Sequence, residues 1–402
     1  MRLVVRTDDN GVTQTGQTGG AAPPLGRRLC VLILNWRDCA HPKAGGAERV
    51  THEIARRWVS WGHQVTLFSA AFPGAVGEQY VDGVRIVRRG SQATVHWEAY
   101  WYYRGQHGGA YDVVIDEVNT IPFFAPLYAR CPVVMFSHQL AREVWRYEAP
   151  FPLSAVGYLA EPLYLQVYRR VPIMTVSRST RTDLRRLGLR GPCRVIPEAV
   201  DTRAPEVLPD LGSKEDALTL VFVGRVVPSK RVDHIVRALA LIRRSQRPGA
   251  GPARLWIVGS WDDEYRRTLD CLIATLGLRD QVTFFGRVDE AAKERLLARA
   301  HVFVMASVRE GWGLVVTEAN VLGTPAVVYD VPGLRDSTID EQTGVVCRRN
   351  TPSDLAAAIV ALHVEPERYL RLRRQAWAMA KQLNWDQTAR AAWEAVEAFV
   401  TA

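Results

Sequence analysis

The stretch Glu310-Gly311-Trp312-Gly313-Leu314-Val315-Val316-Thr317-Glu318 places two carboxylates eight residues apart, with two glycines close behind the first. It follows an apolar, strand-like segment, residues 301–306, and opens an apolar, helix-like segment, residues 314–322. We therefore expect Glu310 in the turn that ends the strand. We expect Glu318 about two turns into the helix, roughly 12 Å further along its axis.

The glycines in this stretch suit the binding of an anion. Gly311 and Gly313 remove side chains where the predicted helix begins. The first N–H groups of that helix, and the positive end of its dipole, can then meet a diphosphate. One carboxylate would lie near the reacting end of a ligand and the other would bind a hydroxyl-rich part. This arrangement suits a nucleotide sugar.

Strand-like and helix-like segments alternate on both sides of this stretch. Residues 29–34 form a short apolar run that is typical of a parallel strand covered on both faces. A helix-like segment with an apolar residue every four positions follows at residues 46–61, and similar pairs recur as far as residue 400. The pattern predicts an α/β fold with two consecutive domains, and the cleft between them is the expected ligand site.

Composition suggests where these domains begin and end. Residues 1–27 are rich in Gly, Thr, Gln and Pro and are predicted to be a disordered leader. The first domain is expected over 28–204. A linker with two prolines and several acids is expected over 205–216, the second domain over 217–383, and a last helix over 384–402.

The chain is basic, with a net charge of +9, so anionic partners are favoured: nucleoside diphosphates, acidic lipids or nucleic acid. No apolar run approaches the roughly 18 residues of a membrane span, and the N-terminus lacks the apolar region of a signal peptide. A cytoplasmic location is therefore expected, with peripheral contact at the inner membrane face left open. The six cysteines contain no C-x-x-C pair, so no metal site is expected.

A second motif follows the first apolar run of the second domain. Gly224-Arg225-Val226-Val227-Pro228-Ser229-Lys230 carries two cations that can converge on one diphosphate from a single loop. The alternative is a pair of solvated surface cations. Lysine is scarce in this chain, so its presence beside the end of a strand favours the phosphate-binding interpretation.

Weaker signals lie at other strand ends. Gly45 and Gly46 allow a phosphate to approach the backbone, although a sharp turn would need glycine too. His138 follows an apolar strand and is either a cleft residue or an ordinary histidine. Arg287 and Val288 follow a glycine that could contact a nucleobase or simply form a turn. The aromatic, arginine-bearing segment 142–170 is an acceptor groove, a membrane-facing surface or, as favoured here, ordinary helix packing.

Taken together, these motifs resemble the family 4 retaining glycosyltransferases over nearly all of residues 28–402. The resemblance implies the GT-B architecture, in which two Rossmann-like, doubly wound domains face each other across a cleft. It implies acceptor binding by the first domain, donor binding by the second, and a last helix that crosses back to the first. It further implies that Glu310 and His138 are catalytic and line the sugar. The implied donor-binding residues are Gly45, Gly46, Arg225, Lys230, Arg287, Val288, Gly313, Leu314, Val315 and Glu318. Of these, Glu318 would accept hydrogen bonds from the ribose hydroxyls.

The resemblance also implies the reaction. A hexose would pass from a UDP- or GDP-sugar to a hydroxyl acceptor on a glycolipid, lipid-linked saccharide or polysaccharide, with an α-linkage. No D-x-D motif is evident in a strand context, so no metal or other cofactor is expected. Three alternatives remain: a nucleotide-sugar epimerase, a basic nucleic-acid-binding protein and a non-catalytic membrane-surface protein. No nucleic-acid module or basic stripe with stacking aromatics supports the second of these.

Overall fold

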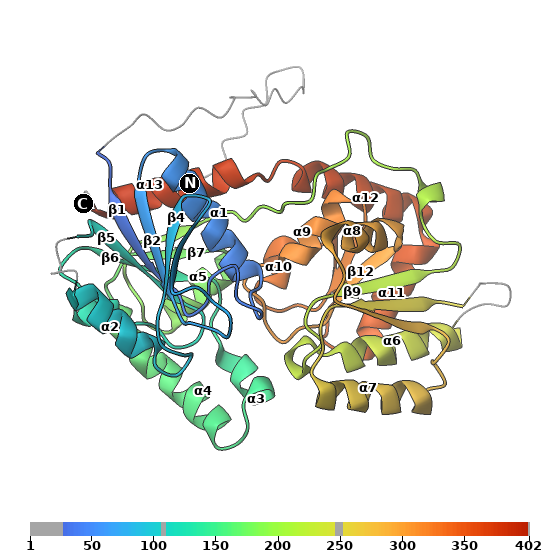
Figure 1. Cartoon of the computed structure of the whole chain (residues 1–402). Coiled ribbons are helices and arrows are strands. Elements are labelled where there is room, and N and C mark those ends of the chain that lie inside the picture. The colour runs from blue at the N-terminus through green and yellow to red at the C-terminus, as the bar shows by residue number, and fades with distance from the viewer. Residues whose placement is uncertain (1–26, 106–109, 246–251, 401–402) are drawn as a thin grey trace.

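The computed structural model describes residues 27–105, 110–245 and 252–400. Two sheets, each covered by helices on both faces, lie side by side (Figure 1), and the predicted α/β fold is confirmed. The predicted leader lies outside the described residues, apart from Arg27. Within the described ranges, no helix is long and apolar enough to cross a membrane.

The first sheet has eight strands in the order β3-β4-β2-β1-β5-β6-β7-β8. All neighbouring strands are parallel except β3, which runs antiparallel to β4. The strands are β1 (Cys30–Leu34), β2 (Gln64–Ser69), β3 (Glu78–Val81), β4 (Val84–Arg88), β5 (Val113–Val118), β6 (Val133–Ser137), β7 (Ile173–Thr175) and β8 (Cys193–Val195). The helices of this half are α1 (Gly46–Ser60), α2 (Val95–Gly105), α3 (Trp145–Glu148), α4 (Leu153–Tyr164) and α5 (Arg178–Arg186).

The second sheet is wholly parallel, in the order β11-β10-β9-β12-β13-β14. Its strands are β9 (Thr219–Val223), β10 (Arg254–Val258), β11 (Val282–Gly286), β12 (Val302–Met305), β13 (Ala326–Val328) and β14 (Gly344–Val346). Its helices are α6 (Val232–Ser245), α7 (Asp263–Thr275), α8 (Glu290–Arg299), α9 (Leu314–Val321), α10 (Leu334–Ser337), α11 (Pro352–Val364) and α12 (Pro366–Ala380).

The order of the strands reverses direction in each sheet. In the first sheet β1 lies between β2 and β5, and in the second β9 lies between β10 and β12. In the first sheet the connections that follow β1 and β5 therefore leave toward opposite faces. The connections that follow β9 and β12 do the same in the second sheet. The crevice outside the carboxyl ends of such strands is where doubly wound sheets bind ligands.

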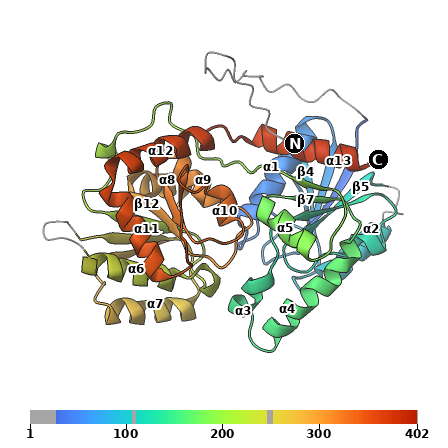
Figure 2. The ribbon, with the colours of Figure 1, turned by 180° about the vertical axis from the view of Figure 1, so that it is seen from behind.

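The last helix, α13 (Trp385–Val400), returns from the second domain to the first. Figures 1 and 2 show it in red beside α1, on the domain that begins the chain. The indole N–H of Trp58 donates to the carbonyl oxygen of Ala389 at 3.0 Å, and Trp58 meets Trp393 edge to face with centroids 5.3 Å apart. An apolar interface therefore ties the end of the chain to its beginning.

Candidate active site

The loops after β9 and β12 bring together a cation and a carboxylate that the sequence predicts to share a site. Lys230 ends η5 (Pro228–Lys230), a short 3-10 turn after β9, and Glu310 lies in the loop after β12. The ammonium nitrogen of Lys230 lies 2.5 Å from Oε1 of Glu310. The hydroxyl of Ser307 donates to the same oxygen at 2.6 Å. Both loops lie where the strand order reverses, so this pair stands at the expected position for a ligand.

Arg225 faces the same region but has a different partner. Its guanidinium Nη2 lies 3.9 Å from Oε1 of Glu148, on α3 of the first domain. The hydroxyl of Ser229 donates to that same carboxylate oxygen. A carboxylate of the first domain thus lies beside Arg225 and Ser229, in the loop that follows β9. Glu148 lies in the aromatic segment 142–170, but it was not among the predicted site residues.

Two helix N-termini meet between the domains. Gly313 precedes α9 with φ 91°, a left-handed conformation that favours glycine. Gly46 is the first residue of α1, and a Cβ built there would lie 2.9 Å from Cδ1 of Leu314, the first residue of α9. The first N–H groups of a helix lack carbonyl partners within it. An anion between these two ends would meet the positive dipole ends of both helices.

The other predicted residues of these two turns keep structural contacts. The backbone N–H of Gly45 donates to the carboxylate of Glu48 at 2.7 Å, which closes the start of α1. Leu314 packs against the apolar core of the first domain, whereas Val315 packs against that of the second. The start of α9 is therefore held by both domains.

The two domains touch directly at the centre of the site. A Cβ on Gly311 would lie 2.7 Å from the backbone oxygen of His138, so only glycine fits there. Arg309, which precedes Glu310 and is buried, pairs with Glu143 at 2.9 Å and with Asp183 at 2.7 Å, both in the first domain. Because of these contacts, the two domains are closed on each other at this point. Arg309 is therefore a further residue of the candidate site, which the sequence did not predict.

His138 is buried between two carboxylates. Its Nε2 lies 3.8 Å from Glu117 and its Nδ1 lies 3.7 Å from Glu198. Both ring nitrogens lack a hydrogen-bond partner at these distances. Burial alone would lower the pKa of this imidazole, but the two carboxylates outweigh it and raise the pKa to about 9. The two carboxylates therefore favour the imidazolium form of His138.

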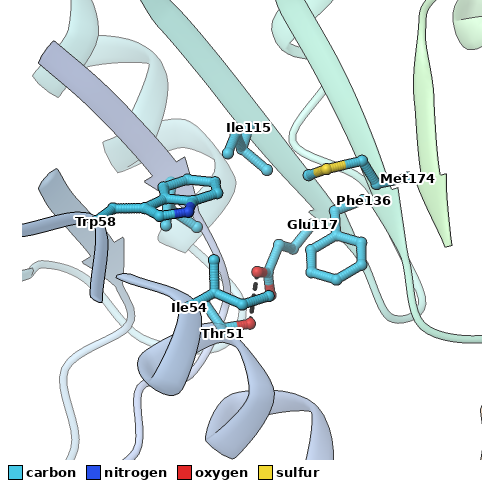
Figure 3. A pocket seen from close by; sticks show the side chains of 8 residues that line it. Thr51, Ile54, Trp58, Ile115, Glu117, Phe136 and Met174 are labelled. Carbon is cyan, nitrogen blue, oxygen red and sulfur yellow. Dashed lines mark hydrogen bonds between the residues drawn. The ribbon is translucent and has the colours of Figure 1, made fainter. Parts of the chain in front are cut away.

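Glu117 is held in place from the first domain's own core. Thr51 donates to Oε1 of Glu117 at 2.6 Å, and the side-chain amide of Asn35 donates to Oε2. Figure 3 shows Thr51 of α1 and Glu117 of β5 facing each other at the edge of an apolar cavity. The cavity measures about 10 Å³, enough for at most one water molecule. It is therefore a packing space beside the histidine cluster and not a substrate pocket.

Glu318 lies in the second turn of α9, slightly nearer the start of the helix than the sequence predicts. Its Oε2 lies 2.9 Å from the ammonium nitrogen of Lys293 on α8, which also pairs with Glu290 at 2.6 Å. Burial raises the pKa of Glu318, and Lys293 counteracts that effect. Lys293 was not predicted, although the scarcity of lysine could have drawn attention to it.

Arg287 and Val288 lie in the connection from β11 to α8, the helix that carries Lys293. Arg287 is exposed, and Val288 packs partly against the core of the second domain. The structure places both near the start of α8, and their contact with a nucleobase stays a prediction. Among residues 27–105, 110–245 and 252–400, no cluster of three metal-ligating side chains occurs. All six cysteines are free thiols; only Cys347 is buried, and Cys271 is exposed.

Comparison with known proteins adds the following. Residues 44–204 match the family model described as Glycosyltransferase Family 4, and residues 204–379 match the model described as Glycosyl transferases group 1. A D-inositol 3-phosphate glycosyltransferase from Thermomonospora curvata is 34% identical over 181 residues, which cover 44% of this chain and 42% of that protein. The matched part thus spans less than half of the curated relative.

Two solved structures share the architecture across nearly the whole chain. Sucrose-phosphate synthase from Thermosynechococcus elongatus superposes with a TM-score of 0.74 at 20% identity, covering 93% of this chain and 100% of that one. HepE from Anabaena, solved in complex with UDP and glucose, superposes with a TM-score of 0.68 at 17% identity, covering 92% and 100%. At these identities the likeness concerns the fold.

Proposed function

Because the chain belongs to the family 4 glycosyltransferases and has the GT-B fold, we propose that it transfers a hexose from a nucleoside diphosphate to a hydroxyl group. The observation that carries this proposal is the pairing of Lys230 with Glu310 beside the two facing helix N-termini. A diphosphate between the domains would meet the ammonium group and the N–H groups at the start of α9. Its sugar would then extend toward Glu310 and His138.

The charges suit the breaking of a glycosyl–phosphate bond. Departure of the diphosphate leaves negative charge on its oxygens and positive charge on the sugar ring. Lys230, Arg225 and the helix ends are fixed in place before the reaction and favour the departing anion. Glu310, which lies next to Lys230, would favour the developing cation of the ring. The imidazolium of His138 would bind hydroxyl oxygens of the sugar as a donor.

We further propose that the anomeric configuration is retained and the new bond is α. In this route the departing phosphate accepts the proton of the acceptor hydroxyl on the same face of the sugar. The contacts of Gly311 with His138 and of Arg309 with the first domain close the cleft, and a closed cleft would limit hydrolysis of the donor by water. The fixed cations would replace the charge neutralisation of a divalent ion, so transfer is proposed to be independent of metal.

Two names among the similar proteins suggest what to try first. One relative is named for transfer to D-inositol 3-phosphate, and the HepE structure contains UDP and glucose. UDP-glucose is therefore the first donor to test, with GDP- and ADP-sugars beside it. A phosphorylated polyol is the first acceptor to test, followed by lipid-linked and polysaccharide acceptors.

A thermal-shift panel of UDP-, GDP- and ADP-sugars on the full chain tests the donor. A ligand at about 100 times its Kd stabilises the native state by roughly 2.7 kcal/mol, so one nucleotide should raise the melting temperature clearly. Transfer is then measured with that donor and each acceptor, with and without excess EDTA. Product that forms without acceptor would indicate an epimerase. A salt-sensitive gel shift without any nucleotide-sugar effect would indicate a nucleic-acid-binding protein. Activity lost to EDTA and restored by magnesium would overturn the metal-free route.

A further inference from the structure

Helix α4 turns its apolar side toward solvent. Leu153, Val156, Leu159 and Leu163 recur at helical spacing and are all exposed, Leu163 to 73%. Phe151, just before the helix, is 84% exposed. Such a row of large apolar side chains is expected on the buried side of a surface helix. Here the row faces solvent, and an exposed apolar patch of this kind marks an interaction surface.

The inner side of α4 carries the polar group instead. Glu161 is the only charged residue of the helix and is buried. Its carboxylate accepts from the backbone N–H groups of Ala141 at 2.7 Å and Arg142 at 2.6 Å. Gly157 lies against the ring of Trp145, so closely that a Cβ would come within 2.5 Å of it. These contacts fix the rotation of α4, so its apolar row cannot turn inward.

Further exposed apolar side chains lie on neighbouring segments. They are Trp97 and Trp101 on α2, and Ile121 in the loop after β5. His96 contacts the carbonyl oxygen of Ile121 at 3.2 Å, and the hydroxyl of Tyr164 donates to the carbonyl oxygen of Thr120 at 2.8 Å. The loop thus joins α2 to α4. Figures 1 and 2 show these two helices on the same outer side of the first domain.

Arginines lie beside the apolar row. Arg142 and Arg146 lie over the ring of Tyr158, in the middle of the helix, at 4.1 and 4.4 Å. Arg169 and Arg170 are exposed just beyond its C-terminal end. Arg142 is mostly buried and pairs with Glu161 at 3.9 Å, so it adds no free charge to the face. Glu143 pairs with Arg309, and Glu148 accepts from Ser229. The exposed Arg146, Arg169 and Arg170 therefore leave the border of the face positive.

We propose that α4, with the exposed rings of α2, docks this chain on the surface of an anionic lipid bilayer. The apolar row would enter the boundary between headgroups and acyl chains, and the arginines would meet lipid phosphates. A second copy of the chain fits less well, because the two arginine borders and two chains of net charge +9 would repel. The docked face would adjoin the candidate active site, because Arg231, next to Lys230, donates to the hydroxyl of Tyr147 on α3 at 2.9 Å.

Vesicle flotation of the full chain tests this proposal without any assay of transfer. We expect the chain to float with phosphatidylcholine vesicles that contain phosphatidylglycerol and much less with pure phosphatidylcholine. The variant Leu159→Glu/Leu163→Glu should lower the partition coefficient at least about tenfold. The control Val207→Glu/Val364→Glu makes the same charge change at exposed apolar positions of the other domain and the linker, and should leave binding unchanged. Trp97→Ser/Trp101→Ser tests the face independently on a second helix.

Three outcomes would overturn the proposal. The first is a wild-type chain that does not float with anionic vesicles. The second is equal loss of flotation in the α4 variant and in its control. The third is light scattering that shows a dimer which the α4 variant dissociates, with no change in flotation, because the face would then belong to a second copy. Circular dichroism melting of each variant checks that it is folded. Failure of the sugar-transfer proposal leaves these outcomes unaffected.

Discussion

The ammonium nitrogen of Lys230 lies 2.5 Å from Oε1 of Glu310, although the two residues are 80 positions apart in the chain. They meet because β9 and β12, the strands that precede them, are neighbours in the second sheet. Each partner neutralises the other when no ligand is bound. A diphosphate bound here, as proposed, would therefore compete with Glu310 for the ammonium group and would free the carboxylate to face the sugar.

Lys230→Ala should weaken binding of the nucleoside diphosphate. The variant removes one charge-assisted hydrogen bond, worth roughly 1.5–3 kcal/mol, so the Kd should rise about 10- to 100-fold. Isothermal titration calorimetry with UDP or GDP measures it. Lys381→Ala removes a lysine that lies over Trp377 on α12, and it should leave the Kd unchanged. Equal affinities for the wild type and Lys230→Ala would remove this loop from the donor site.

Glu310→Gln should abolish transfer while nucleotide binding stays nearly intact. The amide keeps the shape of the carboxylate but cannot offset positive charge on the sugar ring, so kcat should fall by at least about 100-fold. Binding should hold or improve, since Lys230 loses a competing charge. Single-turnover transfer and calorimetry on the same preparation separate the two effects. A variant with the wild-type rate would exclude Glu310 from the reacting centre.

Glu148→Gln should strengthen diphosphate binding. Glu148 lies 3.9 Å from Arg225 and accepts from Ser229, so its negative charge stands where the ligand's charge is proposed to lie. Two unit charges about 4 Å apart in water repel by about 1 kcal/mol, which corresponds to roughly fivefold in Kd. Glu264→Gln on α7 makes the same change at an exposed, distant position and serves as the control. Weaker binding by Glu148→Gln would mean that this carboxylate orders the loop.

Lys293→Met should destabilise the fold. The substitution leaves the half-buried carboxylate of Glu318 without its cation. Removing one partner of a fully buried pair costs about 3 kcal/mol, and a loss of about 1–2 kcal/mol is expected here because both side chains are 14% exposed. Urea denaturation measures the loss. The double variant Lys293→Met/Glu318→Gln should recover most of it, because the side chain at 318 that lost its cation is then neutral. A single variant as stable as the wild type would show that solvent already screens this pair.

The strands of the fold could be predicted because buried parallel strands are short apolar runs between turns. The apolar run predicted at residues 29–34 contains β1, and the strand-like segment predicted at residues 301–306 contains β12. The strand β3 was missed because it lies at the sheet edge, half exposed, and holds only one large aliphatic residue. Its extended shape comes from antiparallel pairing with β4, which no local pattern encodes. Edge strands depend on tertiary contacts more than on their own composition.

The candidate site likewise contains residues that the sequence predicts and residues that only tertiary packing brings there. Positions after β9 and β12 could be located because the turns that follow buried strands converge on one edge of the sheet. The partners Glu148 and Arg309 could not, because each joins the site through packing of one domain on the other. Nor could the sequence foresee that Glu117 and Glu198 enclose His138, since β5 and the segment after β8 meet it only in the folded sheet.

The pKa of His138 should be measurable as a value far above that of an ordinary histidine. Glu117 and Glu198 raise the pKa to about 9, from about 6.5 in an unfolded chain. NMR of the protein with labelled histidine follows the imidazole through a pH titration, and His138→Gln identifies the signal. Glu198→Gln removes one of the two carboxylates and should lower the midpoint by about one unit or more.

The raised pKa of His138 also determines how the free energy of unfolding changes with pH. Because the native state binds this proton more tightly than the unfolded state, the stabilisation is complete below pH 6.5 and is lost as the pH rises through about 9. Between these values one such group lowers the free energy of unfolding by at most about 1.4 kcal/mol per pH unit. Denaturation of the wild type and Glu198→Gln at pH 6.5 and 9 compares the slopes, and the variant's should be shallower. An imidazole that titrates near 6.5, with equal slopes in the two proteins, would show that the neighbouring side chains do not stabilise the imidazolium and that His138 meets the sugar as a neutral ring.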